Sequence, residues 1–207
     1  MTLPDLLFNG PKDAATTIAL AHGAGAPMDS PFMQYFAEEL GSVGFRVARF
    51  EFPYMAERRV TGTKKPPNRG PVLIETWMAV ADALGPADLI VGGKSMGGRI
   101  ASMIADEAGV RGLVALGYPF HPPGRPEKLR TEHLENLNTP ALFCQGTRDP
   151  FGTREEADGF TLSKSIRFHW LEDGDHGFKP RKASGRTEPQ NWDSAIAAIT
   201  EFANALS

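Results

Sequence analysis

Residues 88–104 read DLIVGGKSMGGRIASMI, and the pattern of side chains changes halfway along. Positions 88–92 form a short apolar run, which is typical of a strand buried on both faces. Beyond the glycines, Ile100 and Ile104 recur at helical spacing and place an apolar stripe on one side. The segment therefore predicts a buried strand that passes directly into a helix, with Ser95 at the turn between them.

Gly93, Ser95 and Gly97 form the pattern Gly-x-Ser-x-Gly at this turn. In a nucleophile elbow the serine sits on a strained strand-to-helix turn, which exposes its Oγ above the sheet. Side chains two residues to either side of the serine would collide with neighbouring backbone, so glycine is needed there. Gly98 and Ala101 would further let the helix approach the sheet closely.

Two other interpretations of Ser95 are open. The serine could be a plain helix N-cap. A phosphate-binding loop is the second, but it would need a glycine five residues before Gly93, where the chain has Asp88. The residues of that loop are also those of the predicted strand. The place of the motif between a buried strand and an amphipathic helix favours the elbow.

Short apolar runs alternate with helical patterns along the whole chain. Further buried strands are predicted at Thr16–Ala21, Phe45–Phe52, Gly112–Leu116 and Ala141–Cys144, and a half-exposed edge strand at Ser165–Leu171. Helices are predicted from Pro31 to a stop at Gly41, over Pro71–Leu84, after a capping box of Thr153 and Glu156, and along Trp192–Leu206. This order predicts one α/β domain over residues 1–207, a three-layer α/β/α sandwich with a mostly parallel sheet.

Composition excludes several classes of protein. The chain has 207 residues, a formal net charge of −3 and a single cysteine, Cys144. One cysteine excludes a disulfide framework and a multi-cysteine metal site. The slight acidity argues against a nucleic-acid partner. The sequence contains no run of about 18 apolar residues, which is the length that a membrane-spanning helix needs. The first ten residues do not match a secretory signal. We therefore expect a cytoplasmic protein without a metal or cofactor.

Two further reactive side chains follow strands at their carboxyl ends, where parallel α/β sheets bind ligands. A serine hydroxyl needs a base to take its proton, and His176, after the edge strand, is the candidate. Asp149 is the candidate acid that holds the imidazole in the right tautomer. Asp173 and Asp175 are rival acids, but they lie too close to His176 in sequence for the usual geometry.

The developing oxyanion of an acyl-transfer reaction needs backbone N–H donors. The N–H of Met96, directly after the nucleophile, is one expected donor. The other is expected from the loop after the first buried strand, where the N–H of Ala24 is favoured and that of Gly25 is next in line. The residues expected to contact the substrate are Gly25, Lys94 and Lys179.

The sequence resembles the α/β-hydrolase family over nearly its whole length. The matching motifs are His22–Gly25, Gly93–Gly98, Gly146–Asp149 and Gly174–His176, with Glu51–Met55 and Gly117–Phe120 as further marks. It is similar to the small, cap-less branch near the dienelactone hydrolases, whose bacterial members are similar to an animal testis-expressed protein and a subunit of a histone acetyltransferase complex. The resemblance implies a hydrolase fold without a lid domain, since only Gly117–Pro126 stand where larger members insert one. Dienelactone hydrolases use a cysteine where Ser95 stands, so their substrate is not carried over.

Positive charge is concentrated in two segments. Residues 57–70 hold five basic side chains and one acid, a net +4, and residues 177–187 hold four basic side chains and no acid, also +4. We interpret them as basic loops around the mouth of the site, which would attract an anionic substrate; a merely solubilising surface is the alternative. The expected rim is Lys64, Lys65, Arg69, Lys179, Arg181 and Lys182.

The sequence thus predicts a serine hydrolase that cleaves a carboxylic ester, thioester or lactone of a small molecule through an acyl-enzyme intermediate. The basic loops indicate an anionic substrate. Two alternatives are kept. One is a hydrolase-fold interaction module with little or no catalysis, because animal relatives work partly in that way. The other is a peptidase that uses the same three side chains. Neither the natural substrate nor the oligomeric state follows from the sequence.

Overall fold

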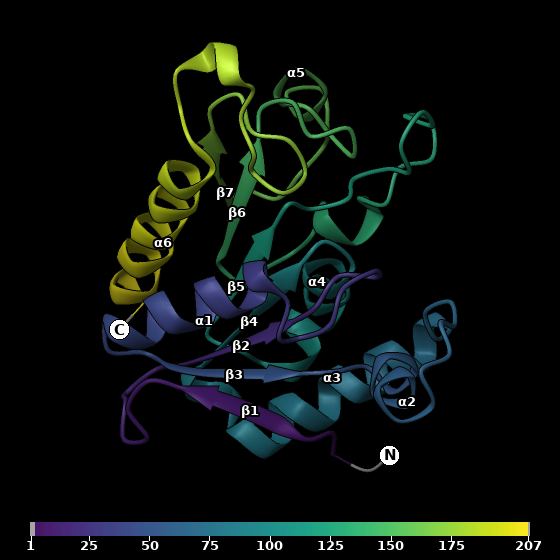
Figure 1. The fold of residues 1–207 in the computed structure, drawn as a ribbon, viewed down its shortest axis with the longest axis vertical. Coiled ribbons are helices and arrows are strands. Elements are labelled where there is room, and N and C mark those ends of the chain that lie inside the picture. The colour runs from purple at the N-terminus through teal and green to yellow at the C-terminus, as the bar shows by residue number, and fades with distance from the viewer. Residues whose placement is uncertain (1–2, 207) are drawn as a thin grey trace.

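The computed structural model describes residues 3–206, and the strands of this part form one sheet (Figure 1). They are β1 (Leu6–Asn9), β2 (Thr17–Ala21), β3 (Arg46–Phe50), β4 (Leu89–Lys94), β5 (Gly112–Leu116), β6 (Ala141–Gly146) and β7 (Ile166–Leu171). Their order across the sheet is β1-β3-β2-β4-β5-β6-β7. β1 runs antiparallel to β3, whereas every other neighbouring pair is parallel.

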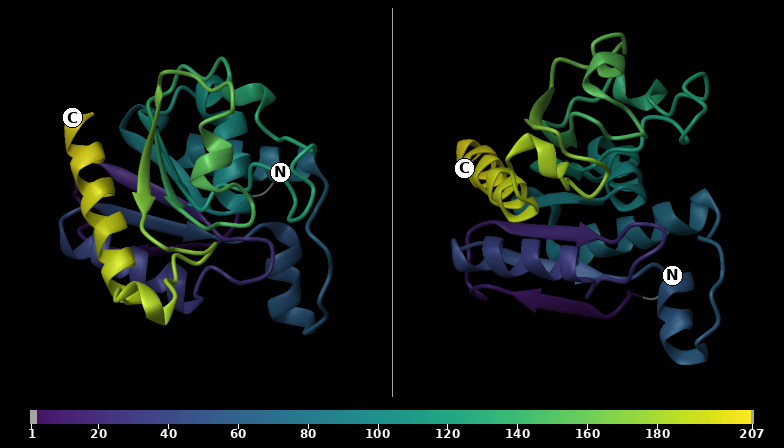
Figure 2. Two further views of the ribbon diagram at one scale, coloured as in Figure 1. Left: turned by 90° about the horizontal axis from the view of Figure 1, so that it is seen from above. Right: turned by 45° about the horizontal axis from the view of Figure 1, so that its top comes forward.

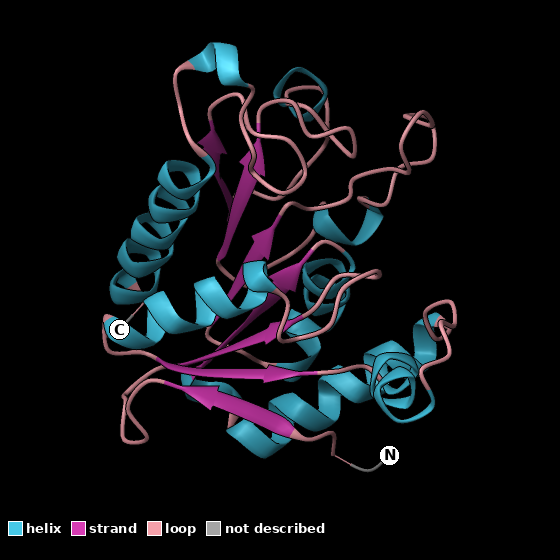
Figure 3. Ribbon diagram, in the orientation of Figure 1, coloured by secondary structure: helices cyan, strands magenta, loops and turns pink. Residues whose placement is uncertain are grey.

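Helices cover both faces of this sheet, as Figures 2 and 3 show. They are α1 (Pro31–Ser42), α2 (Pro53–Thr61), α3 (Gly70–Leu84), α4 (Met96–Ala108), α5 (Arg154–Ala157) and α6 (Glu188–Ala205), with the 3₁₀ turns η1 (Pro86–Asp88), η2 (Glu132–Leu134) and η3 (Lys182–Ser184). α1 and α6 pack on one face, and α3 and α4 pack on the other. The predicted three-layer sandwich with a mostly parallel sheet is confirmed.

Strand β2 shows how the sequence builds the two cores. Its alternate side chains Ile18 and Leu20 belong to the core under α1 and α6, whereas Ala19 and Ala21 belong to the core under α3 and α4. Both sets are fully buried, as a central parallel strand requires. The small alanines lie on the face where α4 approaches β2, and this close approach brings the start of α4 to the strand's carboxyl end.

The predicted elements are present, with three differences. Strand β1 was not predicted, because it has only four residues and is partly exposed, which leaves no buried run to detect. Gly41 does not end its helix, since α1 continues to Ser42. A Cβ at Gly41 would lie 2.9 Å from the backbone nitrogen of Gly10, so this glycine permits close packing rather than a stop.

The third difference is α2, which begins directly after β3 and takes up the first part of the predicted basic loop of residues 57–70. The edge position of β7 and the capping box of Thr153 with Glu156 are confirmed. The segment between β5 and η2 contains no helix or strand, so no lid is built where larger relatives insert one. Within residues 3–206, no helix combines the length and apolarity that a membrane crossing needs.

Candidate active site

Ser95 stands alone between β4 and α4, in a backbone conformation that L residues rarely adopt, with φ 51° and ψ −115°. Its side chain makes no N-cap hydrogen bond to the helix, so the plain N-cap interpretation is excluded. The two flanking glycines are required by the strand beneath them. A Cβ at Gly93 would lie 2.1 Å from the carbonyl oxygen of Ala21, and one at Gly97 would lie 2.3 Å from the same atom. The turn therefore has the geometry of a nucleophile elbow.

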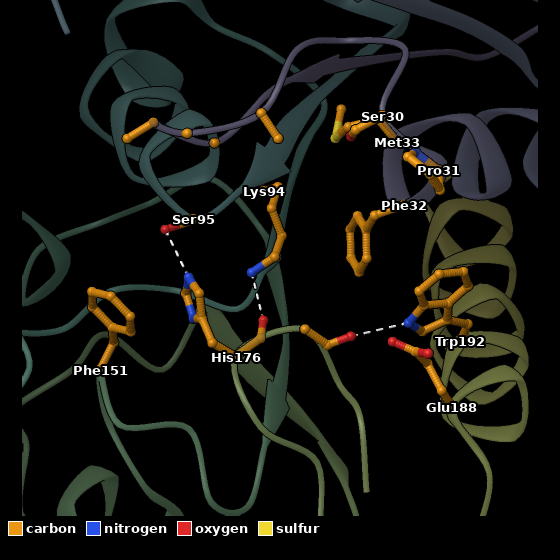
Figure 4. A pocket seen from close by; sticks show the side chains of 15 residues that line it. Ser30, Pro31, Phe32, Met33, Lys94, Ser95, Phe151, His176, Glu188 and Trp192 are labelled. Atoms are coloured by element: carbon orange, nitrogen blue, oxygen red, sulfur yellow. Dashed lines mark hydrogen bonds between the residues drawn. The ribbon is translucent and has the colours of Figure 1, made fainter. Parts of the chain in front are cut away.

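The structure brings together the three side chains that the sequence singles out, Ser95, Asp149 and His176. Figure 4 shows two of them, Ser95 and His176. His176 Nε2 lies 2.9 Å from Ser95 Oγ, and His176 Nδ1 lies 2.8 Å from Asp149 Oδ2. Asp149 is completely buried. Because its carboxylate accepts the Nδ1 proton, Nε2 is left to accept the proton of the serine hydroxyl. This is the arrangement that activates a serine for attack on a carbonyl carbon.

Gln145 supports the acid, and sequence analysis did not single it out. From the buried strand β6, its Nε2 donates to Asp149 Oδ2 at 3.1 Å, and its Oε1 accepts from the backbone N–H of Tyr118 at 2.7 Å. Asp149 also accepts from the backbone N–H of Phe151 at 2.9 Å. A fully buried glutamine at the end of an apolar strand was the available signal, since such an amide needs partners.

The loop that carries His176 is fixed from several sides. The Asp175 carboxylate accepts the backbone N–H groups of Gly177 and Lys179. Trp192 Nε1 donates to the carbonyl oxygen of Gly177 at 3.0 Å (Figure 4). The ring of Phe151 lies against the imidazole, with the ring centroids 4.2 Å apart. The Asp175 carboxylate thus caps its own loop, while the imidazole is hydrogen-bonded to Asp149.

The other rival acid, Asp173, also lies elsewhere. It forms ion pairs with Arg148 and Arg181, and the Arg181 guanidinium is the main cause that holds the pKa of Asp173 down to about 2.

The loop after β2 lies against the serine. A Cβ at Gly23 would be 3.7 Å from Ser95 Cβ. His22 Nδ1 lies 2.7 Å from the carbonyl oxygen of Gly23, while His22 Nε2 accepts from the backbone N–H of Phe52 at 3.2 Å. The imidazole therefore donates from Nδ1, and burial lowers its pKa, which favours this neutral form. His22 therefore anchors the loop.

Tyr54 fixes the same loop, because its hydroxyl lies 3.0 Å from the carbonyl oxygen of Ala24 and 3.4 Å from that of Gly23. In a trans peptide the N–H points opposite to the carbonyl that precedes it. The N–H of Ala24 is thereby directed away from His22 and Tyr54. Met96, whose N–H is the other expected donor, is the first residue of α4.

A pocket of about 570 Å³ opens beside the serine and the imidazole. We call it the aromatic pocket. Its lining includes Gly25, Phe32, Met33, Lys94, Phe151 and Trp192. Glu188, at the start of α6, also lines it (Figure 4). The expected contact residues Gly25 and Lys94 are thus at the pocket. Lys179 is not: its side chain is exposed, and the residue is absent from the lining.

The residues of the predicted basic rim lie outside the lining of this pocket. None of its six residues lines the aromatic pocket. Lys65 forms an ion pair with Glu57, and Arg181 with Asp173. Arg59, from the same basic segment, is held by Glu51 and Asp29. Glu57 belongs to the counted segment, but Glu51, Asp29 and Asp173 lie outside the two basic segments, so charge counting within those segments could not show their ion pairs. In the described part of the chain, no cluster of side chains is suited to hold a metal ion.

Known proteins share this fold. The chain is similar in structure to an alpha-beta serine hydrolase homologue from Coxiella burnetii, with a TM-score of 0.72 and 20% identity over 94% of this chain and 90% of that one. A dienelactone hydrolase from Anabaena variabilis matches with a TM-score of 0.72 and 20% identity over 95% and 89%. A serine hydrolase without a lid from Xanthomonas campestris matches with a TM-score of 0.68 and 20% identity, over 96% of this chain and 88% of that one. A family model described as an alpha/beta hydrolase domain matches residues 14–204. The chain therefore belongs to the alpha/beta hydrolase family.

Proposed function

We propose that this protein is a serine hydrolase that cleaves a carboxylic ester of a small molecule. The observation that carries the proposal is the pair of hydrogen bonds from Ser95 Oγ to His176 Nε2 and from His176 Nδ1 to Asp149 Oδ2. A buried carboxylate, an imidazole and a serine on a strained turn form a unit whose combined chemistry is acyl transfer. A thioester or lactone would react in the same way.

In the first half of the reaction, Ser95 Oγ attacks the carbonyl carbon of the ester while His176 Nε2 takes the hydroxyl proton. The N–H groups of Met96 and Ala24 stabilise the negative charge that develops on the carbonyl oxygen. The bond from the carbonyl carbon to the alcohol oxygen then breaks, and His176 gives its proton to that oxygen. An alcohol leaves, and the acyl group stays on Ser95.

In the second half, His176 takes a proton from water, and the hydroxide attacks the acyl carbon. The bond to Ser95 Oγ breaks, Oγ regains its proton from His176, and the carboxylic acid is released. One ester and one water thus give one acid and one alcohol. Asp149 stays ionised throughout and stabilises the imidazolium in both halves.

The lining and volume of the aromatic pocket indicate which kind of alcohol the ester contains. Its wall of Phe32, Met33 and Trp192 offers apolar surface to a leaving group, at a volume that suits a small organic molecule. Transfer of such a group from water to this surface is favourable at roughly 25 cal/mol per Å² of apolar area buried. We therefore propose esters of an apolar alcohol rather than of a sugar or a polyol.

A fluorophosphonate probe and a set of benzyl esters test this function. The wild-type protein is expected to be labelled at Ser95 and to release benzyl alcohol, and Ser95→Ala is expected to lose labelling and to lower kcat by about 10⁶. The absence of both labelling and turnover from folded wild-type protein would refute the proposal. Turnover of benzylamides at the rate of benzyl esters would replace it with a peptidase-like amidase.

A further inference from the structure

A second pocket adjoins Ser95. It has a volume of about 350 Å³, and it shares Ala24, Ser95 and Phe151 with the aromatic pocket. It differs in its other walls, because Met96 lines it and His176 does not. Two arginines, Arg99 and Arg130, also line it, and we call it the arginine pocket.

The two arginines come from separate elements. Arg99 lies on α4, and its backbone N–H donates to the carbonyl oxygen of Ser95 at 3.0 Å, so it stands one helical turn from the nucleophile. Arg130 lies in the long segment between β5 and η2. Its backbone N–H donates to the carbonyl oxygen of Phe120 at 2.8 Å, and its own carbonyl oxygen accepts from the Tyr118 hydroxyl at 3.1 Å. Both side chains are half-buried and held on a fixed backbone.

Within the described residues, no carboxylate forms an ion pair with either arginine. The ion pairs among residues 3–206 include neither arginine, and no aspartate or glutamate lines the arginine pocket. Burial lowers the pKa of Arg99, and the nearby positive charge of Arg130 also lowers it. Arginine nevertheless stays charged near neutral pH. Two half-buried like charges in one pocket repel each other, and a bound anion would offset that repulsion.

The walls of the two pockets indicate which end of an ester each one holds. In the proposed reaction His176 must reach the leaving alcohol oxygen, so the alcohol belongs on the side that His176 lines, which is the aromatic pocket. Met96 supplies an expected donor to the carbonyl oxygen and lines only the arginine pocket. The acyl chain, which extends from that carbonyl, therefore belongs in the arginine pocket.

Resting on the proposed function, we infer that the substrate is an ester whose acyl chain ends in an acidic group, carboxylate or phosphoryl, and that Arg99 and Arg130 bind this group. Guanidinium groups bind both kinds of anion through paired N–H donors. A benzyl half-ester of a dicarboxylic acid has this form: its benzyl group fits the aromatic pocket, and its free carboxylate reaches the two arginines.

The test compares acyl chains that differ only at their far end. Benzyl half-esters of succinic, glutaric and adipic acid are compared with benzyl butanoate, pentanoate and hexanoate, and with chains that end in a phosphonate. The wild-type kcat/KM for the best acidic chain is expected to exceed that for its neutral counterpart at least tenfold. Arg99→Met and Arg130→Met are each expected to reduce this ratio about threefold, and the double variant is expected to bring it close to one. The same ratio measured for chains that end in a phosphonate, compared with the ratio for carboxylate chains, shows which of the two anions the site prefers.

Arg125→Met is the matched control, because Arg125 is an exposed arginine of the same segment that does not line the arginine pocket. It is expected to leave the ratio unchanged. Calorimetric binding of the half-esters to Ser95→Ala protein needs no turnover, and tighter binding of acidic chains that depends on both arginines would support the inference even if catalysis failed. Turnover of neutral esters without any preference for acidic chains would overturn the inference that Arg99 and Arg130 bind an acidic group. The proposed esterase function would stand in that case.

Discussion

Lys94 Nζ donates a 2.5 Å hydrogen bond to the backbone carbonyl oxygen of His176, a residue 82 positions further along the chain. Since Lys94 directly precedes Ser95, one side chain ties the strand that carries the serine to the loop that carries the imidazole. The same nitrogen lies 5.5 Å and 5.7 Å from the ring centroids of Phe32 and Phe178. Lys94 is thus held by a carbonyl and two aromatic faces. We infer that it positions His176 rather than serving only to attract substrate.

Lys94→Met should loosen this connection while it keeps most of the apolar stem. Without the hydrogen bond the imidazole samples positions from which Nε2 cannot take the Ser95 proton, so kcat is expected to fall about tenfold with a smaller change in KM. Steady-state kinetics with a benzyl ester measures both constants. Lys12→Met replaces an exposed lysine that does not line the pocket and serves as the control. A rise in KM with kcat unchanged would instead indicate direct contact of Lys94 with substrate.

The same lysine predicts how stability changes with pH. Burial lowers the pKa of Lys94 to about 8, although Asp149 and Asp175 act in the opposite direction. Between pH 8 and the unfolded value near 10.5, the unfolded chain binds more protons than the folded one, so the free energy of unfolding rises with pH in this window. The gain is roughly 1–3 kcal/mol, since each pKa unit is worth about 1.4 kcal/mol.

Urea denaturation of wild type and Lys94→Met at pH 7.5 and pH 10 isolates this contribution from those of other groups. The free energy of unfolding of wild type relative to the variant should increase toward pH 10. A constant difference between the two proteins would show that the lysine titrates as it does in water.

The backbone of Ser95 is strained, in the conformation that holds the serine at the nucleophile elbow. Its φ of 51° with ψ of −115° lies outside the regions that residues with a Cβ prefer. Ser95→Gly should therefore be more stable than Ser95→Ala by about 1 kcal/mol, even though glycine gains more entropy in the unfolded chain. Neither variant has a nucleophile, so thermal and urea denaturation compare backbone strain alone. Equal stability of the two variants would mean that the turn is relaxed.

Gln145 tests how far the acid depends on its surroundings. Gln145→Met keeps the length of the side chain but leaves the buried backbone N–H of Tyr118 and one oxygen of Asp149 without that partner. The free energy of unfolding is expected to fall by about 2–3 kcal/mol, because each unpaired buried group costs about 1–3 kcal/mol. kcat should fall as well, since Asp149 becomes free to turn from the imidazole. Gln34→Met, on the exposed face of α1, is the control for the loss of a glutamine.

The part of the site that could be predicted from the sequence is the part that local geometry dictates. Collisions with the backbone of Ala21 require the glycines around Ser95, and their spacing is visible in the sequence. Asp149 and His176 each follow a strand, and a parallel sheet brings all such ends to one edge. The pairing of these residues then follows from their chemistry.

The contacts that tune the site could not be predicted in this way, because each joins segments far apart in the chain. Arg99 and Arg130 meet in one pocket only because of the path of the chain between β5 and η2, which no periodic pattern specifies. Charge counting along residues 57–70 was incomplete for the same reason. It could not show that Glu51 and Asp29 would compensate Arg59, or that α2 would form there.

Phe32 should set the size of alcohol that the site accepts. It lies on the first turn of α1, with its ring centroid 5.4 Å from that of Trp192 and 4.6 Å from that of Phe36, and it lines the aromatic pocket. Phe32→Ala removes this part of the wall and enlarges the pocket. The kcat/KM for a naphthylmethyl ester should therefore rise relative to that for a methyl ester of the same acid, by about tenfold, since a ring-sized difference in apolar contact is worth more than 1 kcal/mol. Phe8→Ala, which removes an exposed aromatic ring of β1 outside the pocket, should leave the ratio unchanged. An equal loss of kcat/KM for both esters would show that Phe32 supports the packing of α1 instead of contacting the alcohol. The aromatic pocket would then have to be assigned to another part of the substrate.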